Sequence, residues 1–151
     1  MNKIETILTD EKDVRFHRLV EELDSGYYKR IGDELDRYKQ YNDFTKPHVV
    51  IILLDSDNPV ACASYRQCSD DIVEFKRVYV KKQYRKRGIA FNLIKKLEKH
   101  AVKNNYRYSY IVTGKNNTAA IRLYEKLNYR QIPKFGQFKD DETVVCMKKE
   151  F

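Results

Sequence analysis

The stretch from Val73 to Ala101 most narrowly limits how this chain can fold. It opens with VEFKRVYV, whose β-branched and aromatic residues predict a strand, and continues with a basic turn, KKQYRKRGIA. The segment after the turn, FNLIKKLEKHA, is expected to form an amphipathic helix. Its apolar face comprises Ala90, Leu93, Ile94, Leu97 and Ala101, and its polar face Lys95, Lys96, Glu98 and Lys99. A strand, a glycine turn and a helix in this order predict a site that cradles phosphate groups.

The expected anion site lies at the start of this helix, where the first backbone N–H groups have no intrahelical partner. Gly88 lets the backbone approach a ligand without a Cβ, and Ala90 is the smallest residue that still favours a helix. Arg85, Lys86 and Arg87 supply donors for phosphate oxygens. A basic turn before a helix also occurs in solvated loops, so this pattern alone leaves both interpretations open.

A second block of residues, from Asn117 to Tyr129, follows the strand-like segment YSYIVTG. The two blocks together resemble the acetyl-CoA-binding core of the GNAT-type N-acetyltransferase superfamily. The first signature of that superfamily, Gln/Arg-x-x-Gly-x-Gly/Ala, is matched by Arg85, Gly88 and Ala90. The second signature, Asn-x-x-Ala-x-x-x-Tyr, is matched by Asn117, Ala120 and Tyr124.

The resemblance implies an α/β fold with a mixed, mostly antiparallel sheet, in which a central pair of parallel strands splays apart and helices flank the sheet. It also implies acetyl-CoA as co-substrate, because superfamily members hold the pantetheine arm like an extra strand at the splay. A backbone N–H of Val78 or Val80 then polarises the thioester carbonyl. The residues that the resemblance assigns to acetyl-CoA are Val78, Tyr79, Val80, Arg85, Lys86, Arg87, Gly88, Ile89, Ala90, Asn117, Ala120 and Tyr124.

Local patterns predict the remaining strands. Val49–Leu54 and Val60–Gln67 flank a turn-rich link and predict an antiparallel hairpin. The strand-helix-strand crossover from Val73 to Val112 instead requires a parallel neighbour. An alternating pattern predicts a first strand over Ile4–Leu8. Because the chain has 151 residues, 42% of them hydrophobic, and no linker or repeat, we expect one domain over residues 1–151.

Two helices are expected between the first strand and the hairpin, with Gly26 as the break between them. The first covers residues 10–23, with Val14, Leu19, Val20 and Leu23 inward, and the second covers residues 27–41. In the superfamily such a pair lines the acceptor side of the cleft, which makes several side chains candidate acceptor contacts. These candidates are Asp24, Tyr27, Tyr28, Asp33 and Glu34, although surface charges and packing aromatics are the commoner role of such residues.

Two features near the C terminus bear on the resemblance. Superfamily members usually have glycine where this chain has Asn128, and asparagine also tolerates the left-handed conformation that ends a helix. Phe135 and Phe138 lie in a tail that resembles the closing loop of small-molecule members. They are expected either to wall an acceptor pocket or to cap the core.

The net charge of +8 suits a nucleic acid, a membrane surface or a phosphorylated cofactor. The cations concentrate beside the predicted cradle, where coenzyme A would bring its phosphates, and no nucleic-acid motif accompanies them; we therefore expect no nucleic acid partner. The longest apolar run, Val49–Leu54, is too short to span a bilayer, and the first residues carry acids where a signal peptide is apolar. A cytoplasmic protein without a membrane partner is expected.

Cysteine and histidine spacing predicts no metal site. Cys62, Cys68 and Cys146 are odd in number and have no ligand spacing, so reduced thiols are expected. The three histidines are isolated from one another and from acids at useful spacings.

Two residues are candidates for acid-base chemistry. An alkyl ammonium is neutral only about once in 2,500 at pH 7, so an amine acceptor benefits from a base. Glu74 stands six residues before Val80, the spacing at which superfamily members place a strand glutamate as base; the alternative is an ion pair with Lys76 or another cation. By resemblance, the hydroxyl of Tyr124 lies near the leaving sulfur and acts as the acid, whereas the alternative is a packed core tyrosine.

The expected function is N-acetyl transfer from acetyl-CoA to a primary amine, a small molecule by preference, by direct attack in a ternary complex. The alternatives are transfer to a protein N terminus or lysine, a catalytically silent CoA-binding or regulatory module, and a nucleic-acid-binding domain. A homodimer is compatible with the resemblance.

Overall fold

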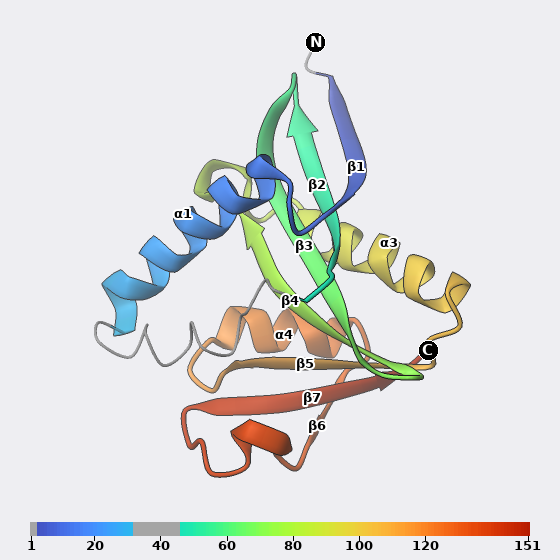
Figure 1. Cartoon of the computed structure of the whole chain (residues 1–151). Helices are drawn as coiled ribbons and strands as arrows, with labels where there is room; N and C mark the ends of the chain where they lie inside the picture. Colours follow the sequence, from blue (N-terminus) through green and yellow to red (C-terminus); the bar gives the residue numbers. More distant parts are fainter. Residues whose placement is uncertain (1–2, 32–45) are drawn as a thin grey trace.

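The computed structural model describes residues 3–31 and 46–151, and their side chains except at residues 26–31. The described strands form one sheet in the order β1-β2-β3-β4-β5-β7-β6, with helices on both faces (Figure 1). The strands are β1 (Ile4–Asp10), β2 (Val49–Asp55), β3 (Asn58–Ser69), β4 (Ile72–Val80), β5 (Tyr108–Gly114), β6 (Arg130–Ile132) and β7 (Val144–Glu150). The helices are α1 (Val14–Ile31), α3 (Ile89–Lys103) and α4 (Thr118–Lys126), with short 3-10 turns η2 (Lys82–Tyr84) and η3 (Gly136–Phe138).

The strand pairing confirms the expected mixed sheet. All described pairs are antiparallel except β4 with β5, which are joined by the crossover through α3. The β2–β3 hairpin turns over Ser56 and Asp57, whose φ angles of 49° and 71° match the two-residue turns that suit twisted strands. The predicted first strand is present as β1, which pairs with β2 along its whole length.

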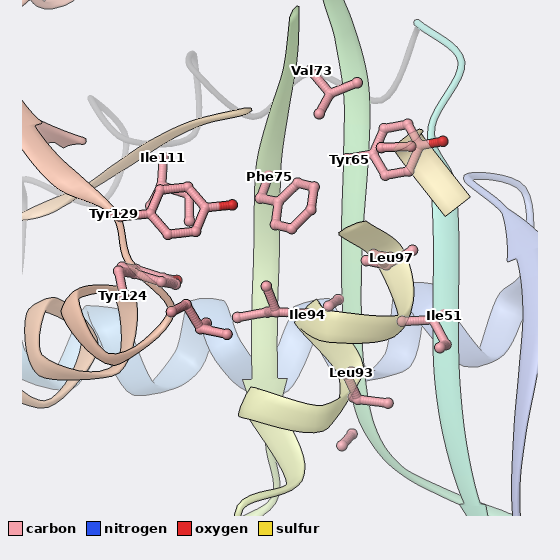
Figure 2. Close-up of a cluster of buried hydrophobic side chains, with 14 of the residues drawn as sticks. Ile51, Tyr65, Val73, Phe75, Leu93, Ile94, Leu97, Ile111, Tyr124 and Tyr129 are labelled. Carbon is pink, nitrogen blue, oxygen red and sulfur yellow. The ribbon is translucent and has the colours of Figure 1, made fainter. Parts of the chain in front are cut away.

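Two apolar clusters hold the helices to the sheet. The larger cluster packs α3 and α4 on one face, and Figure 2 shows Leu93, Ile94 and Leu97 of α3 in this cluster with Phe75 of β4 and Ile51 of β2. The smaller cluster packs α1 on the opposite face. Each helix therefore buries its apolar stripe, which supplies the main hydrophobic stabilisation of the fold.

The predicted break at Gly26 is wrong, because α1 continues through it to Ile31. An isolated glycine inside a helix costs about 1 kcal/mol relative to alanine, which packing of the helix overrides. Residues 32–41 of the second predicted helix lie outside the described part of the chain.

The start and inner face of α1 also differ from the prediction. The helix begins at Val14 because the carboxylate of Asp13 accepts a hydrogen bond from the N–H of Arg15 at 2.9 Å, while Asp10 still belongs to β1. Val14 is 61% exposed rather than inward, and Phe16 is buried completely in its place. The carboxylate of Asp13 also pairs with the guanidinium of Arg15, which lowers the pKa of Asp13.

Glu98 was expected on the polar face of α3 but is buried. Its carboxylate accepts hydrogen bonds from the hydroxyl of Tyr129 at 3.2 Å and from Nζ of Lys149 at 3.0 Å. Both partners come from elements distant in the sequence, so helical periodicity alone did not indicate this burial. The carboxylate and the burial together raise the pKa of Tyr129 far above its ordinary value.

The expectation for Asn128 is confirmed. Its φ is 72°, in the left-handed region, directly after α4. The N–H of Asn128 donates to the carbonyl of Glu125 and the N–H of Tyr129 to the carbonyl of Tyr124, both at 2.9 Å. This is the hydrogen-bond pattern of a Schellman helix end.

Replacing Asn128 with alanine should lower the free energy of unfolding by about 1 kcal/mol, because alanine is strained at positive φ. Asn128→Gly should preserve stability, and Asn116→Ala serves as an exposed control. Urea denaturation of the three variants measures the differences. An alanine variant as stable as the wild type would show that the left-handed conformation carries no such cost.

Candidate active site

The two parallel strands separate halfway along β4. Their register begins at Ile72 with Tyr108 and ends at Phe75 with Ile111. Beyond that point β4 continues to pair with β3 as far as Val80, and β5 continues to pair with β7 as far as Gly114. The expected splay is therefore present, and within the described chain the facing backbone edges beyond Phe75 and Ile111 have no strand partner.

A β-bulge in β4 accompanies the splay. The register with β3 passes from Ser64 opposite Lys76 to Cys62 opposite Tyr79, so two residues of β4, Arg77 and Val78, oppose one of β3. Arg77 has a φ of 56°, an uncommon value for a residue with a side chain. Because position 77 is not a glycine, no sequence signal indicated the bulge.

Side chains of β3 hold the bulge in place. The hydroxyl of Ser64 donates to the carbonyl of Lys76 at 2.7 Å, and Sγ of Cys62 donates to the carbonyl of Arg77 at 3.4 Å. These bonds satisfy backbone oxygens that the bulge removes from the regular ladder. Burial raises the pKa of the Cys62 thiol to about 12, so Cys62 is a neutral structural donor.

The bulge is also tied to α1. The guanidinium of Arg77 donates to the carboxylate of Asp24 in an ion pair. Asp24, expected to be an acceptor contact or a surface charge, is thus a link between α1 and β4. A second link runs from the hydroxyl of Tyr79 to the carboxylate of Glu22 at 3.0 Å, and burial together with this bond raises the pKa of Tyr79.

The other acceptor candidates are Tyr27, Tyr28, Asp33 and Glu34. Asp33, Glu34 and the side chains of Tyr27 and Tyr28 lie outside the described residues.

The predicted phosphate cradle lies between β4 and α3. Gly88 has a φ of 74° and directly precedes α3, and no side chain caps this helix. The first helical hydrogen bond runs from the N–H of Asn92 to the carbonyl of Gly88 at 3.1 Å. A Cβ on Gly88 would meet no atom within 4 Å, so the space beside the glycine is open. Ile89 and Ala90 form the first, half-buried turn of the helix.

Three exposed cations, Arg85, Lys86 and Arg87, directly precede Gly88 in the chain. Nε of Arg85 donates to the carbonyl of Val80 at 2.8 Å, which joins the basic turn to the end of β4. Arg87 donates to the carbonyl of Gln83 at 3.2 Å, and Lys86 has a φ of 63°. An uncapped helix start, an open glycine and exposed cations together suit a phosphate group.

The second signature has a structural explanation in α4. The side chain of Asn117 accepts a hydrogen bond from the N–H of Ala120 at 3.2 Å, so Asn117 caps the helix. Ala120 packs against the larger apolar cluster. The spacing of these two residues is therefore that of a helix cap and its third residue.

Tyr124 lies one helical turn farther along α4, in the larger cluster (Figure 2). Its ring meets that of Tyr129 at 62° with 6.0 Å between centroids, and the residue is 7% exposed. Packing in the core, the alternative considered for Tyr124, is therefore observed. Its role as an acid stays a prediction.

Glu74 lies on the opposite face of the sheet from Tyr124. Its neighbours Val73 and Phe75 point into the cluster beneath α3, so the side chain of Glu74 points to the α1 face. The carboxylate is buried and pairs with Arg66 at 3.0 Å and with Lys76 at 3.4 Å. Burial lowers the pKa of Lys76 while Glu74 opposes this shift. The expected pairing is present, and a role as base stays a prediction.

The C-terminal tail covers the α1 face of the sheet beside β5. Phe138 is buried with Val144 and Cys146, as expected of a core cap. Phe135 is half-buried and its ring lies 4.5 Å from that of Tyr110. Tyr110 is the residue of β5 opposite Glu74, so Phe135 and Glu74 border the same part of this face.

Other classes of site receive no support from the described residues. They contain no group of three His, Cys, Asp or Glu side chains arranged to hold a metal. No helix among them has the length and hydropathy to cross a membrane. The three cysteines are free thiols.

Comparisons with known proteins agree with this geometry. The family model described as Acetyltransferase (GNAT) family matches residues 16–129. A Xenopus tropicalis protein named "Probable N-acetyltransferase 14" is 28% identical over 98 residues, which are 64% of this chain and 48% of that protein. The chain thus matches about half the length of this relative.

Solved structures with low sequence identity share the fold. A Klebsiella pneumoniae protein assigned as an acyl-CoA N-acyltransferase superposes with a TM-score of 0.77 at 24% identity, over 96% of this chain and 97% of that one. The PaiA N-acetyltransferase of Thermoplasma acidophilum, in complex with coenzyme A, gives 0.76 at 14% identity over 99% of both chains. Since the family model covers most of the sequence and the fold agrees, this chain belongs to the acetyltransferase (GNAT) family.

Proposed function

We propose that this protein is an N-acetyltransferase that moves the acetyl group of acetyl-CoA to a primary amine while both substrates are bound. The proposal depends on the separation of β4 from β5 and on the start of α3, which follows Gly88 and has no side-chain cap. That combination supplies free backbone edges for an extended arm and a positive site for phosphates. The similar structure from Thermoplasma acidophilum, which is in complex with coenzyme A, supports the choice of ligand.

The chain's own residues suit acetyl-CoA in two places. The first turn of α3, from Gly88 to Ala90, would receive the pyrophosphate, with Arg85, Lys86 and Arg87 around it. Backbone groups of Val78, Tyr79 and Val80 would hold the pantetheine arm on the open edge of β4, with Asn117, Ala120 and Tyr124 across the splay on α4. Acetyl-CoA supplies the activated acyl group, and the bulge at Arg77 sets the direction of the adjacent N–H groups.

The thiols of the chain favour direct attack over a covalent intermediate. A nucleophilic cysteine needs a lowered pKa. Burial instead raises the pKa values of Cys62 and Cys146, and the thiol of the exposed Cys68 does not have a lowered pKa either. The amine of the acceptor is therefore proposed to attack the thioester itself, within a ternary complex.

The proposed base and the proposed acid lie on opposite faces of the sheet. On the α1 face Glu74 is the proposed base for the acceptor ammonium, with Arg66 and Lys76 orienting its carboxylate. On the α4 face the hydroxyl of Tyr124 is proposed to donate a hydrogen bond to the sulfur as it departs. A free tyrosine is less acidic than a thiol, so hydrogen bonding during departure fits better than complete proton transfer.

The acceptor is proposed to be a small amine bound on the α1 face, where Phe135 and Tyr110 form an aromatic wall beside Glu74. A protein N terminus or lysine is the competing acceptor class. The buried ion pairs of Glu74 favour a second function, a CoA-binding module without turnover, because they hold the base in a stable arrangement. One domain over residues 1–151, a cytoplasmic location and a homodimer remain proposals.

The direct test measures release of free thiol from acetyl-CoA with a panel of small amines and short peptides, against a control without acceptor. We expect release above the control with one acceptor class. Gly88→Val should abolish both release and the rise in melting temperature caused by acetyl-CoA, because valine is strained at positive φ and fills the open space. Thermal stabilisation by acetyl-CoA without release for any acceptor would instead favour the silent module.

Replacing Glu74 with glutamine should reduce kcat/KM by about 10²-fold or more near pH 7. The deficit should shrink towards pH 10, where the acceptor amine loses its proton without help. A pH–rate profile for both proteins measures this, with Glu142→Gln as an exposed control. Parallel profiles across the whole range would remove Glu74 from the proton transfer.

Replacing Tyr124 with phenylalanine should lower kcat by about tenfold or more while leaving the affinity for acetyl-CoA nearly intact. The ring still fills its place in the core, and only the hydroxyl is lost. Steady-state kinetics together with acetyl-CoA titration separate the two effects, and Tyr108→Phe is the matched control. Unchanged turnover would assign Tyr124 to packing alone.

A further inference from the structure

The sheet keeps one long open edge in its described part. The edge strand β6 has three residues, whereas the edge strand β1 has seven, all paired to β2 on one side only. Figure 1 shows β1 at the outer edge of the sheet. Proteins usually shorten, bend or charge such edges, because unpaired backbone groups accept another strand.

On the α3 face of this edge Thr6 lies between two aliphatic residues, Ile4 and Leu8, and Asp10 ends the strand on the same face. Ile4 and Leu8 are each 57% exposed, and strand alternation places both on the same face as Thr6. Ile7 belongs to the cluster on the other face, which confirms that assignment. Exposed aliphatic side chains on an open edge are typical of a binding surface.

A lysine of α3 reaches the middle of the strand. Nζ of Lys96 donates to the hydroxyl oxygen of Thr6 at 3.1 Å. A groove of about 490 Å³ runs between β1 and α3, with Leu53 and Leu93 among its lining residues. The ammonium group is thus held at Thr6, between the aliphatic side chains of Ile4 and Leu8.

The exposed face of α3 carries only positive charge. Between Lys82 and Lys103 every exposed charged side chain is a cation, and Glu98, the one acid, is buried. Phosphates bound at the helix start account for the basic turn, but Lys103 lies about 20 Å along the helix from that start. None of the ion pairs between described residues involves the exposed lysines of α3. Lysines four residues apart repel one another, so this arrangement is unfavourable for the helix alone.

We propose that the outer edge of β1 binds an extended segment of a partner protein in which two aliphatic residues flank an acidic one at alternate positions. In the added strand, the aliphatic side chains lie beside Ile4 and Leu8, and the acidic side chain lies beside Thr6. Directly opposed residues of neighbouring strands have Cβ atoms about 5 Å apart, so the acid reaches the ammonium of Lys96. Backbone hydrogen bonds to β1 provide the remaining affinity.

A second copy of this chain suits the edge less well. An antiparallel copy of β1 can place its acidic Glu5 opposite Thr6. In that register the aliphatic Ile7 of the copy lies opposite Ile4, but Lys3 lies opposite Leu8, where the proposed partner has an aliphatic residue. Two chains of net charge +8 also repel one another. A nucleic acid would use the cations but gains nothing from Ile4 and Leu8.

The test measures binding of the full chain to a fluorescein-labelled peptide, Gly-Thr-Ile-Thr-Glu-Thr-Ile-Thr-Gly, by fluorescence anisotropy. A second peptide carries lysine in place of glutamate. We expect the glutamate peptide to bind with a Kd of about 10–100 μM and the lysine peptide at least about tenfold more weakly. Absence of binding at about 1 mM peptide would overturn the proposal.

Two variants locate the contact. Leu8→Lys should weaken binding of the glutamate peptide about tenfold, whereas Val14→Lys, at an exposed valine of α1, should leave it unchanged. Lys96→Glu should reverse the preference, so that the lysine peptide binds better than the glutamate peptide. Circular dichroism and melting temperature verify that each variant is folded. Binding insensitive to both Leu8→Lys and Lys96→Glu would contradict the assignment to this edge.

The alternative occupants give different results. Sedimentation velocity that shows a dimer which Leu8→Lys converts to a monomer would assign the edge to a second copy and overturn the proposal. A single-stranded oligonucleotide that binds in a Lys96-dependent, Leu8-independent manner and displaces the peptide would overturn it in favour of a nucleic acid. A peptide complex that resists the oligonucleotide, in a protein whose oligomeric state Leu8→Lys leaves unchanged, supports the proposed protein segment.

Discussion

The end of pairing between β4 and β5 after Phe75 and Ile111 is the constraint on which the rest of the site depends. Two parallel strands that stayed paired would leave no free backbone edge in the middle of the sheet. Here β4 stays paired with β3, and β5 stays paired with β7. The two strands can therefore separate while each keeps one hydrogen-bonded edge. The separation is stable because each strand keeps one complete ladder.

The bulge at Arg77 makes β4 leave the direction of β5, and it requires support because Arg77 has a positive φ. That support comes from three residues of two elements. Ser64 and Cys62 of β3 bind the displaced carbonyl groups, and Asp24 of α1 binds the guanidinium. The helix that borders the proposed acceptor side is thereby joined to the strand that borders the proposed acetyl-CoA side, so the geometry of the two substrates is coupled.

Much of the proposed cofactor site could be predicted from the sequence, because its residues are close together in the chain. Gly88 lies at the start of α3 and Asn117 caps α4, so both signatures fall at helix starts, while the binding roles that they imply stay predictions. The residues of the proposed acceptor side could be predicted less well. Asp24 was considered as a substrate contact or surface charge, yet its partner is Arg77, 53 residues away. Local patterns carry no information about such a pair.

The family resemblance implied the class of the fold, and local patterns in the sequence predicted the β2–β3 hairpin, the crossover through α3, the start of α3 after Gly88 and the left-handed end of α4 at Asn128. These features depend on periodicity, turn chemistry and capping, which are properties of neighbouring residues. Long-range contacts, which no local pattern indicated, determine that α1 continues through Gly26, that Glu98 is buried and that β4 bulges at Arg77, whereas the separation of β4 from β5 was implied by the family resemblance. In each of these cases contacts between distant segments outweigh the local preference: packing on the sheet compensates for a helical glycine, and Tyr129 with Lys149 compensates for a buried carboxylate.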